Sequence, residues 1–262
     1  MKAKLLCLLG LLFFTTPALM FAGSACATPT IVPADGRIVD FDFVAPSGTN
    51  FYQFNATSGR SYSVELRQDY DDVNTDLTTS LNSDAGTGCA TAVAGTTDTH
   101  LVAPAMPSNA TRLSFVASAT QPFSIKVANS NATTGRYISI SVSETTMYSA
   151  NFFSGFGYQT AYTFVNTTGS AISGTLNLID ASNGAVDGTS TITLAAGAAA
   201  LVDTVGGNHT NATAMNVTPG KTGSAVFTHN GPPGSVLAAS FLQNLSANYV
   251  QAFDLKPLRQ GR

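Results

Sequence analysis

Apolar and polar side chains alternate in short runs along most of the chain. Val39, Phe41 and Phe43 fall on one face of such a run, and residues 137–143 repeat the pattern. Successive side chains of a β-strand point to opposite faces, so alternation of this kind predicts strands that are buried on one side. Turn-forming Gly, Asn and Pro residues separate the runs at intervals of roughly 8–12 residues. The sequence therefore predicts an all-β protein of antiparallel strands.

The runs fall into two halves with an aromatic stretch between them. Residues 28–145 and residues 159–262 each contain enough short strands for one antiparallel β-sandwich, and the second half suggests an immunoglobulin-like sandwich. The stretch between them, residues 146–158, is rich in large apolar side chains, whereas a flexible linker would be rich in Gly and Ser. We therefore expect two tandem sandwiches joined by a stiff, packed junction.

This aromatic junction has two interpretations. It can be a plug between the two domains, which we favour because monomeric proteins rarely expose contiguous apolar surface. It can also be a ligand platform, since small β-sandwiches often stack sugars on aromatic rings, although the chain lacks Trp, the ring best suited to this. The platform would comprise four side chains: Tyr148, Phe152, Phe156 and Tyr158.

The N-terminal residues have the pattern of a cleaved export signal. Lys2 and Lys4 precede an apolar run over residues 5–14, and the small-x-small tripeptide that ends at Ala27 is what a signal peptidase recognises. The apolar run is too short to span a bilayer comfortably. We predict that residues 1–27 form a signal peptide and that the mature protein is secreted, either outside the cell or into a periplasm, without a transmembrane anchor.

The position of the cleavage site decides which cysteines remain in the mature protein. Cleavage after Ala27 discards Cys26 and leaves Cys89 alone, so both cores would have to hold by packing without a disulfide. Cleavage upstream of Cys26 would instead permit a Cys26–Cys89 bridge. A lipoprotein processed at Cys26 is a further alternative, although Gly23 stands where such sites usually carry Leu.

The charge of the chain narrows the classes of partner. The full sequence has a net charge of −3, and only 10% of its residues are charged. Removal of the signal peptide makes the charge more negative because Lys2 and Lys4 are lost with it. Nucleic-acid binding requires basic clusters, so we do not expect a partner of this class.

Residues 50–66 carry a resemblance to a known family. They read as an aromatic strand, a turn of small residues with Gly, and an alternating strand, and residues 135–142 supply a closing strand. This arrangement, over residues 35–145, resembles the bacterial pre-peptidase C-terminal domain. The resemblance implies a jelly-roll-like β-sandwich, usually appended to secreted enzymes, that aids substrate or surface binding and sometimes holds calcium. No peptidase domain accompanies it here, so we do not expect an accessory role within the same chain.

The order of the two halves carries a second resemblance. Together they look like uncharacterised secreted bacterial proteins that have a Gly-Pro-Pro-Gly turn, found here at residues 231–234. This resemblance implies export and a bacterial source, but it implies no activity.

An acidic loop lies within the first half. Calcium prefers roughly six to eight oxygen ligands, and closely spaced carboxylates in one loop can supply them. An EF-hand is excluded because Leu77 stands where its loop needs Gly. A solvated acidic loop without metal is the alternative. The candidate calcium ligands are four aspartates: Asp69, Asp71, Asp72 and Asp76.

The sequence contains no recognisable catalytic constellation. Nucleophilic hydrolysis needs a Ser or Cys with a His and a carboxylate, and G-x-S-x-G is absent. The histidines lie far apart, at His100, His209 and His229, and H-E-x-x-H is absent. We therefore predict no enzymatic activity and no cofactor other than calcium. The alternative is a hydrolase, or a hydrolase accessory, that acts on an extracellular polymer through His209 or His229.

These observations favour a non-catalytic secreted or cell-surface protein with a binding or structural role. We expect its partner to be an extracellular polysaccharide, a protein matrix or a component of the cell envelope, bound by loops at the ends of the sandwiches. A self-assembling surface subunit is a further alternative, because low charge and exposed strand edges favour self-association.

Overall fold

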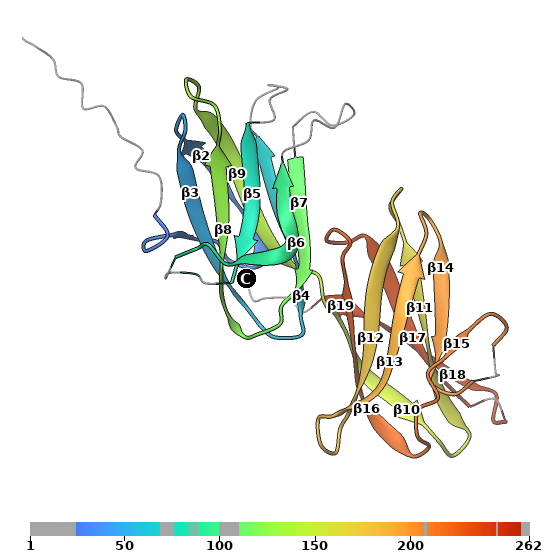
Figure 1. Cartoon of the computed structure of the whole chain (residues 1–262). Coiled ribbons are helices and arrows are strands. Elements are labelled where there is room, and N and C mark those ends of the chain that lie inside the picture. Colours follow the sequence, from blue (N-terminus) through green and yellow to red (C-terminus); the bar gives the residue numbers. More distant parts are fainter. Residues whose placement is uncertain are drawn as a thin grey trace, which may run out of the picture.

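The protein is built from β-sheets. The computed structural model describes residues 25–68, 76–83, 85, 88–99, 110–206, 209–244 and 246–257. In this part of the chain all regular secondary structure is β-strand, which confirms the all-β prediction. The strands form four sheets, and Figure 1 shows them packed as two pairs, with the strands of residues 30–144 in one pair and those of residues 147–257 in the other.

The first sandwich encloses one hydrophobic core between two sheets. Its strands are β1 Thr30–Ile31, β2 Asp35–Val44, β3 Thr49–Ala56, β4 Ser61–Gln68, β5 Leu77–Asn82, β6 Ala92–Thr99, β7 Ala110–Val116, β8 Gln121–Asn129 and β9 Arg136–Glu144. One sheet has the order β1-β3-β8-β5-β6 and the other β2-β9-β4-β7. Tyr52 and Phe54 on β3 and Leu66 on β4 are buried between them, on the faces that the alternating pattern predicts.

The strand β2 departs from simple alternation. Its pairing with β9 shifts register at two places. Each irregularity changes the face on which the following side chains lie. Val39 packs against the core and Val44 is fully buried, whereas the ring of Phe43 lies 4.9 Å from the half-exposed ring of Tyr137. The shared face expected for Val39 and Phe43 is therefore wrong.

The second sandwich has its own core. Its strands are β10 Met147–Ser154, β11 Tyr158–Asn166, β12 Ile172–Asp180, β13 Val186–Leu194, β14 Ala199–Asp203, β15 Thr213–Ala214, β16 Lys221–His229, β17 Val236–Asn244, β18 Tyr249–Asp254 and β19 Lys256–Pro257. The sheet orders are β13-β12-β16-β10-β19 and β15-β14-β11-β17-β18. Phe164 on β11 and Phe227 on β16 join the two sheets, with ring centroids 4.3 Å apart in the buried core.

The connection between the sandwiches is short and polar. The chain leaves β9 at Glu144 and enters β10 at Met147. The hydroxyl of Thr145 donates to Ser61 Oγ at 2.9 Å, and the backbone N–H of Ser61 donates to Thr146 Oγ1 at 2.8 Å. The backbone N–H of His229, in the second sandwich, donates to the same Ser61 hydroxyl at 3.3 Å. Buried hydroxyl groups at the end of β4 therefore join the two bodies.

Most of the stretch expected to form an aromatic plug belongs to the second sandwich. Met147 and Phe152 are buried in its core, because β10 continues directly into the hairpin with β11. Tyr148 alone among the four candidate platform residues contacts the connection, where its hydroxyl donates to Glu144 Oε1 at 2.7 Å.

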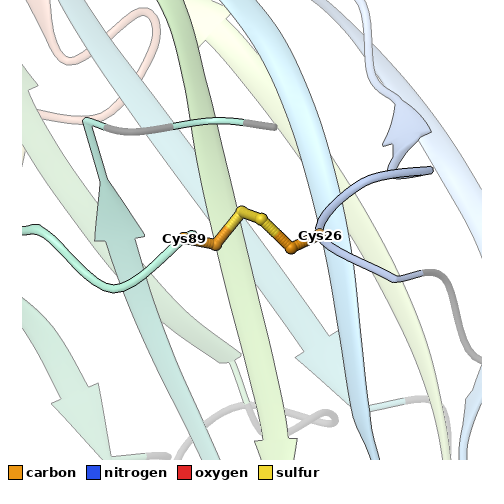
Figure 2. The surroundings of a disulfide bond; sticks show 2 residues. All are labelled: Cys26 and Cys89. Atoms are coloured by element: carbon orange, nitrogen blue, oxygen red, sulfur yellow. A yellow bond between two sulfur atoms is a disulfide. The ribbon is translucent and has the colours of Figure 1, made fainter. Parts of the chain in front are cut away.

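A disulfide joins the N-terminal segment to the first sandwich. Cys26 and Cys89 are bonded, with their Cα atoms 5.9 Å apart, and Figure 2 shows the bridge between the two segments. This is the bridge that cleavage upstream of Cys26 would permit, whereas the expectation that Cys89 stands alone after cleavage at Ala27 remains a prediction. In the part of the chain that the structure describes, no helix is long and apolar enough to cross a membrane.

Candidate functional site: an exposed aromatic hairpin tip

The hairpin of β10 and β11 ends in a tight turn at Gly155, Phe156 and Gly157. The N–H of Tyr158 donates to the carbonyl of Gly155 at 2.8 Å, and the N–H of Gly155 donates back to the carbonyl of Tyr158 at 2.9 Å. Phe156 and Gly157 occupy the two central positions with φ of +53° and +81°. Positive φ at both positions is the signature of a type I′ turn, which favours Asn-Gly. Phe occupies the position where Asn would be usual.

Phe156 is both exposed and strained. Its side chain is 87% exposed, the highest value among the large apolar residues in the described part of the chain. The left-handed conformation of a bulky non-Gly residue costs about 1–2 kcal/mol. Neither property helps folding, and residues held in such conformations concentrate at functional sites. The tip of this hairpin is therefore the strongest candidate for a binding contact.

Three further rings extend from Phe156 across the surface. The ring of Phe153 on β10 lies 6.5 Å from Phe156 and 5.8 Å from Tyr158 on β11, and Tyr158 lies 6.2 Å from Tyr249 on β18. Neighbouring rings are tilted or edge to face, the arrangements that aromatic pairs prefer. Tyr249 is 42% exposed. We call Phe153, Phe156, Tyr158 and Tyr249 the aromatic strip.

The turn that carries Phe156 is braced from behind. A Cβ atom at Gly155 would lie 2.5 Å from the backbone nitrogen of Gly220, so only Gly permits this close approach. The N–H of Gly220 in turn donates to the carbonyl of Ser154. The tip is therefore fixed to the neighbouring 219–220 turn, and its ring can be presented without a large loss of conformational entropy on binding.

A hollow of about 350 Å³ lies beside the turn. Its lining is uncharged and includes the ring of Tyr158 together with the polar side chains of Gln159 and Ser246. The hydroxyl of Ser246 donates to Asn244 Oδ1 at 2.8 Å. At the other end of the strip the hydroxyl of Tyr249 donates to Gln251 Oε1 at 2.6 Å. Aromatic rings and neutral polar groups thus lie together at this end of the second sandwich.

The structure separates the four residues of the predicted platform. Phe156 and Tyr158 lie in the aromatic strip, but Phe152 is only 1% exposed and cannot contact a ligand. Tyr148 lies at the connection between the sandwiches, where the guanidinium of Arg60 sits 5.7 Å from the centre of its ring. The four side chains therefore do not lie together on one surface.

Sequence reasoning missed two members of the strip, Phe153 and Tyr249. The pairing of β10 with β16 shifts register between Ser149 and Phe152, which turns Phe152 inward and leaves Phe153 partly exposed. A bulge of this kind has no clear sequence signal. Tyr249 joins through the pairing of β18 with β17, and β17 pairs with β11.

The predicted calcium loop falls largely outside the described residues. Asp69, Asp71 and Asp72 lie there, so the calcium prediction remains a prediction. Asp76 is described, and its Oδ2 accepts hydrogen bonds from Arg136 Nη2 at 2.5 Å and from Asn131 Nδ2 at 3.0 Å. These two partners lower the pKa of the Asp76 carboxyl. Among the described residues, no group of three or more His, Cys, Asp or Glu side chains is placed to hold a metal ion.

His209 is held by hydrogen bonds on both ring nitrogens. Its Nδ1 lies 2.9 Å from both oxygens of the buried Asp203, and its Nε2 lies 3.1 Å from the side-chain nitrogen of Gln243. An Nδ1–H tautomer satisfies both contacts, because Nδ1 then donates to the carboxylate and Nε2 accepts from the amide. A base acting on a Ser hydroxyl would need Nε2 for that purpose, and here Gln243 occupies it.

Of the other two histidines, the structure describes only His229. His229 is only 4% exposed, and its Nδ1 accepts a hydrogen bond from the N–H of Gly231 at 3.1 Å. Burial lowers the pKa of His229 to about 4. His100 lies outside the described residues. Both His209 and His229 thus form side-chain hydrogen bonds within the fold.

Comparison with protein-family models gave no match, and comparison with curated protein sequences gave none either.

Proposed function

We propose that this is an exported, non-catalytic protein that binds an extracellular polysaccharide through the aromatic strip. The observation that carries the proposal is Phe156, a bulky side chain held exposed in a strained backbone conformation at a braced turn. The apolar faces of sugar rings stack on aromatic side chains, and Tyr adds a hydroxyl that can bond to water or to a sugar hydroxyl. Tyr158 and Tyr249 supply such hydroxyl groups next to the two Phe rings.

The chemistry around the strip supports a neutral polysaccharide rather than a charged one. The hollow beside the turn has an uncharged lining, and the hydroxyl groups of Tyr158 and Ser246 there suit sugar hydroxyls. The net charge of the chain, −3, disfavours approach to strongly anionic polymers. A neutral polymer with exposed sugar faces is therefore the class of ligand that we propose.

Export is part of the same proposal. The first residues have the pattern of a signal peptide, and disulfides such as Cys26–Cys89 persist in oxidising compartments. The first sandwich resembles a pre-peptidase C-terminal domain over residues 35–145. It would act as a spacer for the second sandwich, which carries the aromatic strip, or add a second contact with the polysaccharide.

A pull-down on insoluble polymers tests the proposal. The chain without its signal peptide would be mixed with cellulose, chitin, xylan and peptidoglycan, and the bound fraction measured after sedimentation. We expect retention on a neutral polysaccharide and its loss in Phe156→Asn. Tyr137→Ala is the matched control, because Tyr137 is an aromatic residue 39% exposed on the first sandwich. Absence of retention on every polymer would overturn the proposal.

The edge of the second sandwich supports self-assembly as a second candidate function. The strand β18 is the last of its sheet, and it exposes Val250 at 64% and Tyr249 at 42%. An exposed, apolar edge strand can pair with a second copy. Large oligomers that form as the protein concentration rises, seen by light scattering, would favour this function; a monomer at all concentrations would remove it.

A further inference from the structure

The segment that follows the predicted signal sequence is built into the first sandwich. β1 pairs in parallel with β3, placing Thr30 opposite Tyr52. The N–H of Val32 donates to the carbonyl of Gln53 at 2.9 Å, and the Val32 side chain is only 1% exposed. Residues 30–32 are therefore held by backbone pairing and by burial of Val32 in the core.

The disulfide extends this attachment to Cys26. The N–H of Thr28 donates to the carbonyl of Ala25 at 3.0 Å, which folds the chain into a turn around Cys26. Its partner, Cys89, is only 3% exposed and lies in the connection between β5 and β6. The bridge thus joins a defined N-terminal turn to a buried position in a different part of the same sandwich (Figure 2).

We propose that the export signal is removed upstream of Cys26, so that the Cys26–Cys89 disulfide belongs to the mature protein. Cleavage after Ala27 would discard one of the two sulfur atoms that the fold brings together. The sequence offers another site that a signal peptidase can use, because Ala22 and Ser24 are small residues two positions apart. Cleavage between Ser24 and Ala25 would leave the turn around Cys26 complete.

The same bridge excludes a lipid anchor at Cys26. Lipoprotein processing also cuts before a cysteine, but it attaches the lipid to the sulfur of that cysteine through a thioether. One sulfur atom cannot hold a thioether and a neutral disulfide together. The mature protein is therefore not attached to a membrane through Cys26.

Formation of the bridge requires an oxidant. The two thiols lose two protons and two electrons in total, and an oxidised dithiol–disulfide oxidoreductase of the export compartment accepts them. A thiolate first attacks that protein's disulfide to give a mixed disulfide, and the second cysteine then displaces the reduced oxidoreductase. The oxidoreductase leaves as a dithiol, so atoms and electrons balance.

Mass spectrometry of the exported protein tests the proposal. The full chain would be expressed with its own leader in a bacterium with two membranes, collected from the periplasm or the medium, and denatured in the presence of excess N-ethylmaleimide so that buried thiols also react. N-terminal sequencing should give Ala25 or an earlier residue. A non-reducing tryptic digest should give a linked pair, the peptide that ends at Arg37 and the peptide of residues 68–112 that contains Cys89, which separates on reduction.

Three results would overturn the proposal: an N-terminus at Thr28, a maleimide adduct on Cys89 in the wild-type protein, or a lipid mass on the peptide that begins at Cys26. The variant Cys26→Ser is the control. It should be processed at the same bond and should carry the maleimide adduct on Cys89, which shows that the thiol is detected when it is free.

Discussion

At the scale of single residues, Phe156 combines properties that a fold does not need. Its φ of +53° lies in the left-handed region, and its ring is 87% exposed. Asn in the same place would adopt this conformation readily and would form the Asn-Gly pair that a type I′ turn prefers. The presence of Phe is explained if its ring contacts a ligand, since stability is often lower at sites that serve binding.

The variant Phe156→Asn should therefore make the protein more stable. We expect a gain of about 0.5–1 kcal/mol in the free energy of unfolding, because backbone strain is relieved and little burial is lost. Urea denaturation followed by circular dichroism would measure it. Gly157→Ala is the control, because its φ of +81° should make any side chain unfavourable and lower the stability. A loss of stability in Phe156→Asn would contradict the strain argument.

Prediction from the sequence failed for some single residues of the aromatic strip. Composition and spacing identified Phe156 and Tyr158 as aromatic residues of interest, but they did not distinguish Phe152 from Phe153. That distinction depends on the register shift in β10, which is set by pairing with β16. Cross-strand pairing is a tertiary property, so the pattern within one strand cannot supply it.

At the scale of elements, an asparagine at the end of a strand supports each sandwich. Asn129, the last residue of β8, donates through Nδ2 to the carbonyls of Val44, Ala45 and Thr134. Asn166, the last residue of β11, likewise donates through Nδ2 to three carbonyls, those of Ser170, Leu194 and Ala195. Both side chains are almost fully buried, at 3% and 1% exposure.

Removal of the Asn166 amide should destabilise the second sandwich. Its Nδ2 lies 2.7 Å from the carbonyl of Ser170 and 3.0 Å from that of Ala195, and Oδ1 accepts from the N–H of Thr168 at 2.8 Å. Asn166→Ala leaves these groups without that partner, so we expect a loss of about 2–3 kcal/mol. Chemical denaturation would measure it.

The matched control for this prediction is Asn183→Ala. Asn183 is exposed and accepts one hydrogen bond, from the N–H of Ala185 at 2.9 Å. Its loss should cost less than about 1 kcal/mol, because water can replace the partner at the surface. Equal effects of the two substitutions would show that the buried amide of Asn166 has no special role.

Much of the element scale was accessible from the sequence. The pattern over residues 50–66 predicted an aromatic strand and an alternating strand joined by a turn, and the structure has both strands, with Tyr52, Phe54 and Leu66 in the core. The pattern failed in β2, where two irregularities in the pairing with β9 reverse the faces. Alternation is reliable where pairing is regular, and bulges are decided by the neighbouring strand.

At the scale of the whole molecule, two cores are joined by few groups. The disulfide acts only on the first sandwich, because both cysteines belong to it. In the described part of the chain, Ser61 contacts Thr145, Thr146 and His229 between the bodies, and the guanidinium of Arg60 lies over the ring of Tyr148. Signal cleavage, disulfide formation and the polar connection each involve residues that are far apart in the sequence. The spacing of residues therefore could not decide between the alternatives for the cysteines and for the junction.

Loss of the disulfide should weaken the first sandwich selectively. The cysteines are 63 residues apart, and closing a loop of this length in the unfolded chain corresponds to about 4 kcal/mol in the chain-entropy model. We expect Cys26→Ser with Cys89→Ser to lower the melting temperature of the first sandwich. Differential scanning calorimetry would show whether a second transition, from the other sandwich, stays in place. A parallel fall of both transitions would contradict separate cores.

The burial of His229 predicts acid sensitivity. Its pKa is lowered to about 4 in the folded protein, because burial disfavours the charged imidazolium, whereas the unfolded chain takes up the proton near pH 6.5. Between these values the unfolded state binds more protons, so stability falls as the pH drops from about 6.5 to 4 and the effect is complete below 4. The full effect is about 3 kcal/mol.

Thermal melting across this pH range would check the prediction in the wild-type protein and in His229→Gln. The variant should show a shallower dependence on pH between about 6.5 and 4. His209→Gln is the control for removal of one imidazole from the second sandwich. An unchanged slope in His229→Gln would show that other groups cause the acid sensitivity.

The proposed binding of a neutral polysaccharide by the aromatic strip depends on Phe156. The most direct test is a binding isotherm on the polymer that retains the wild-type protein, measured for the wild type, Phe156→Asn and Tyr137→Ala. We expect Phe156→Asn to weaken binding by about tenfold or more, as for an exposed aromatic anchor, while remaining folded and at least as stable. Tyr137→Ala should bind as the wild type does. Wild-type affinity in Phe156→Asn would contradict the account.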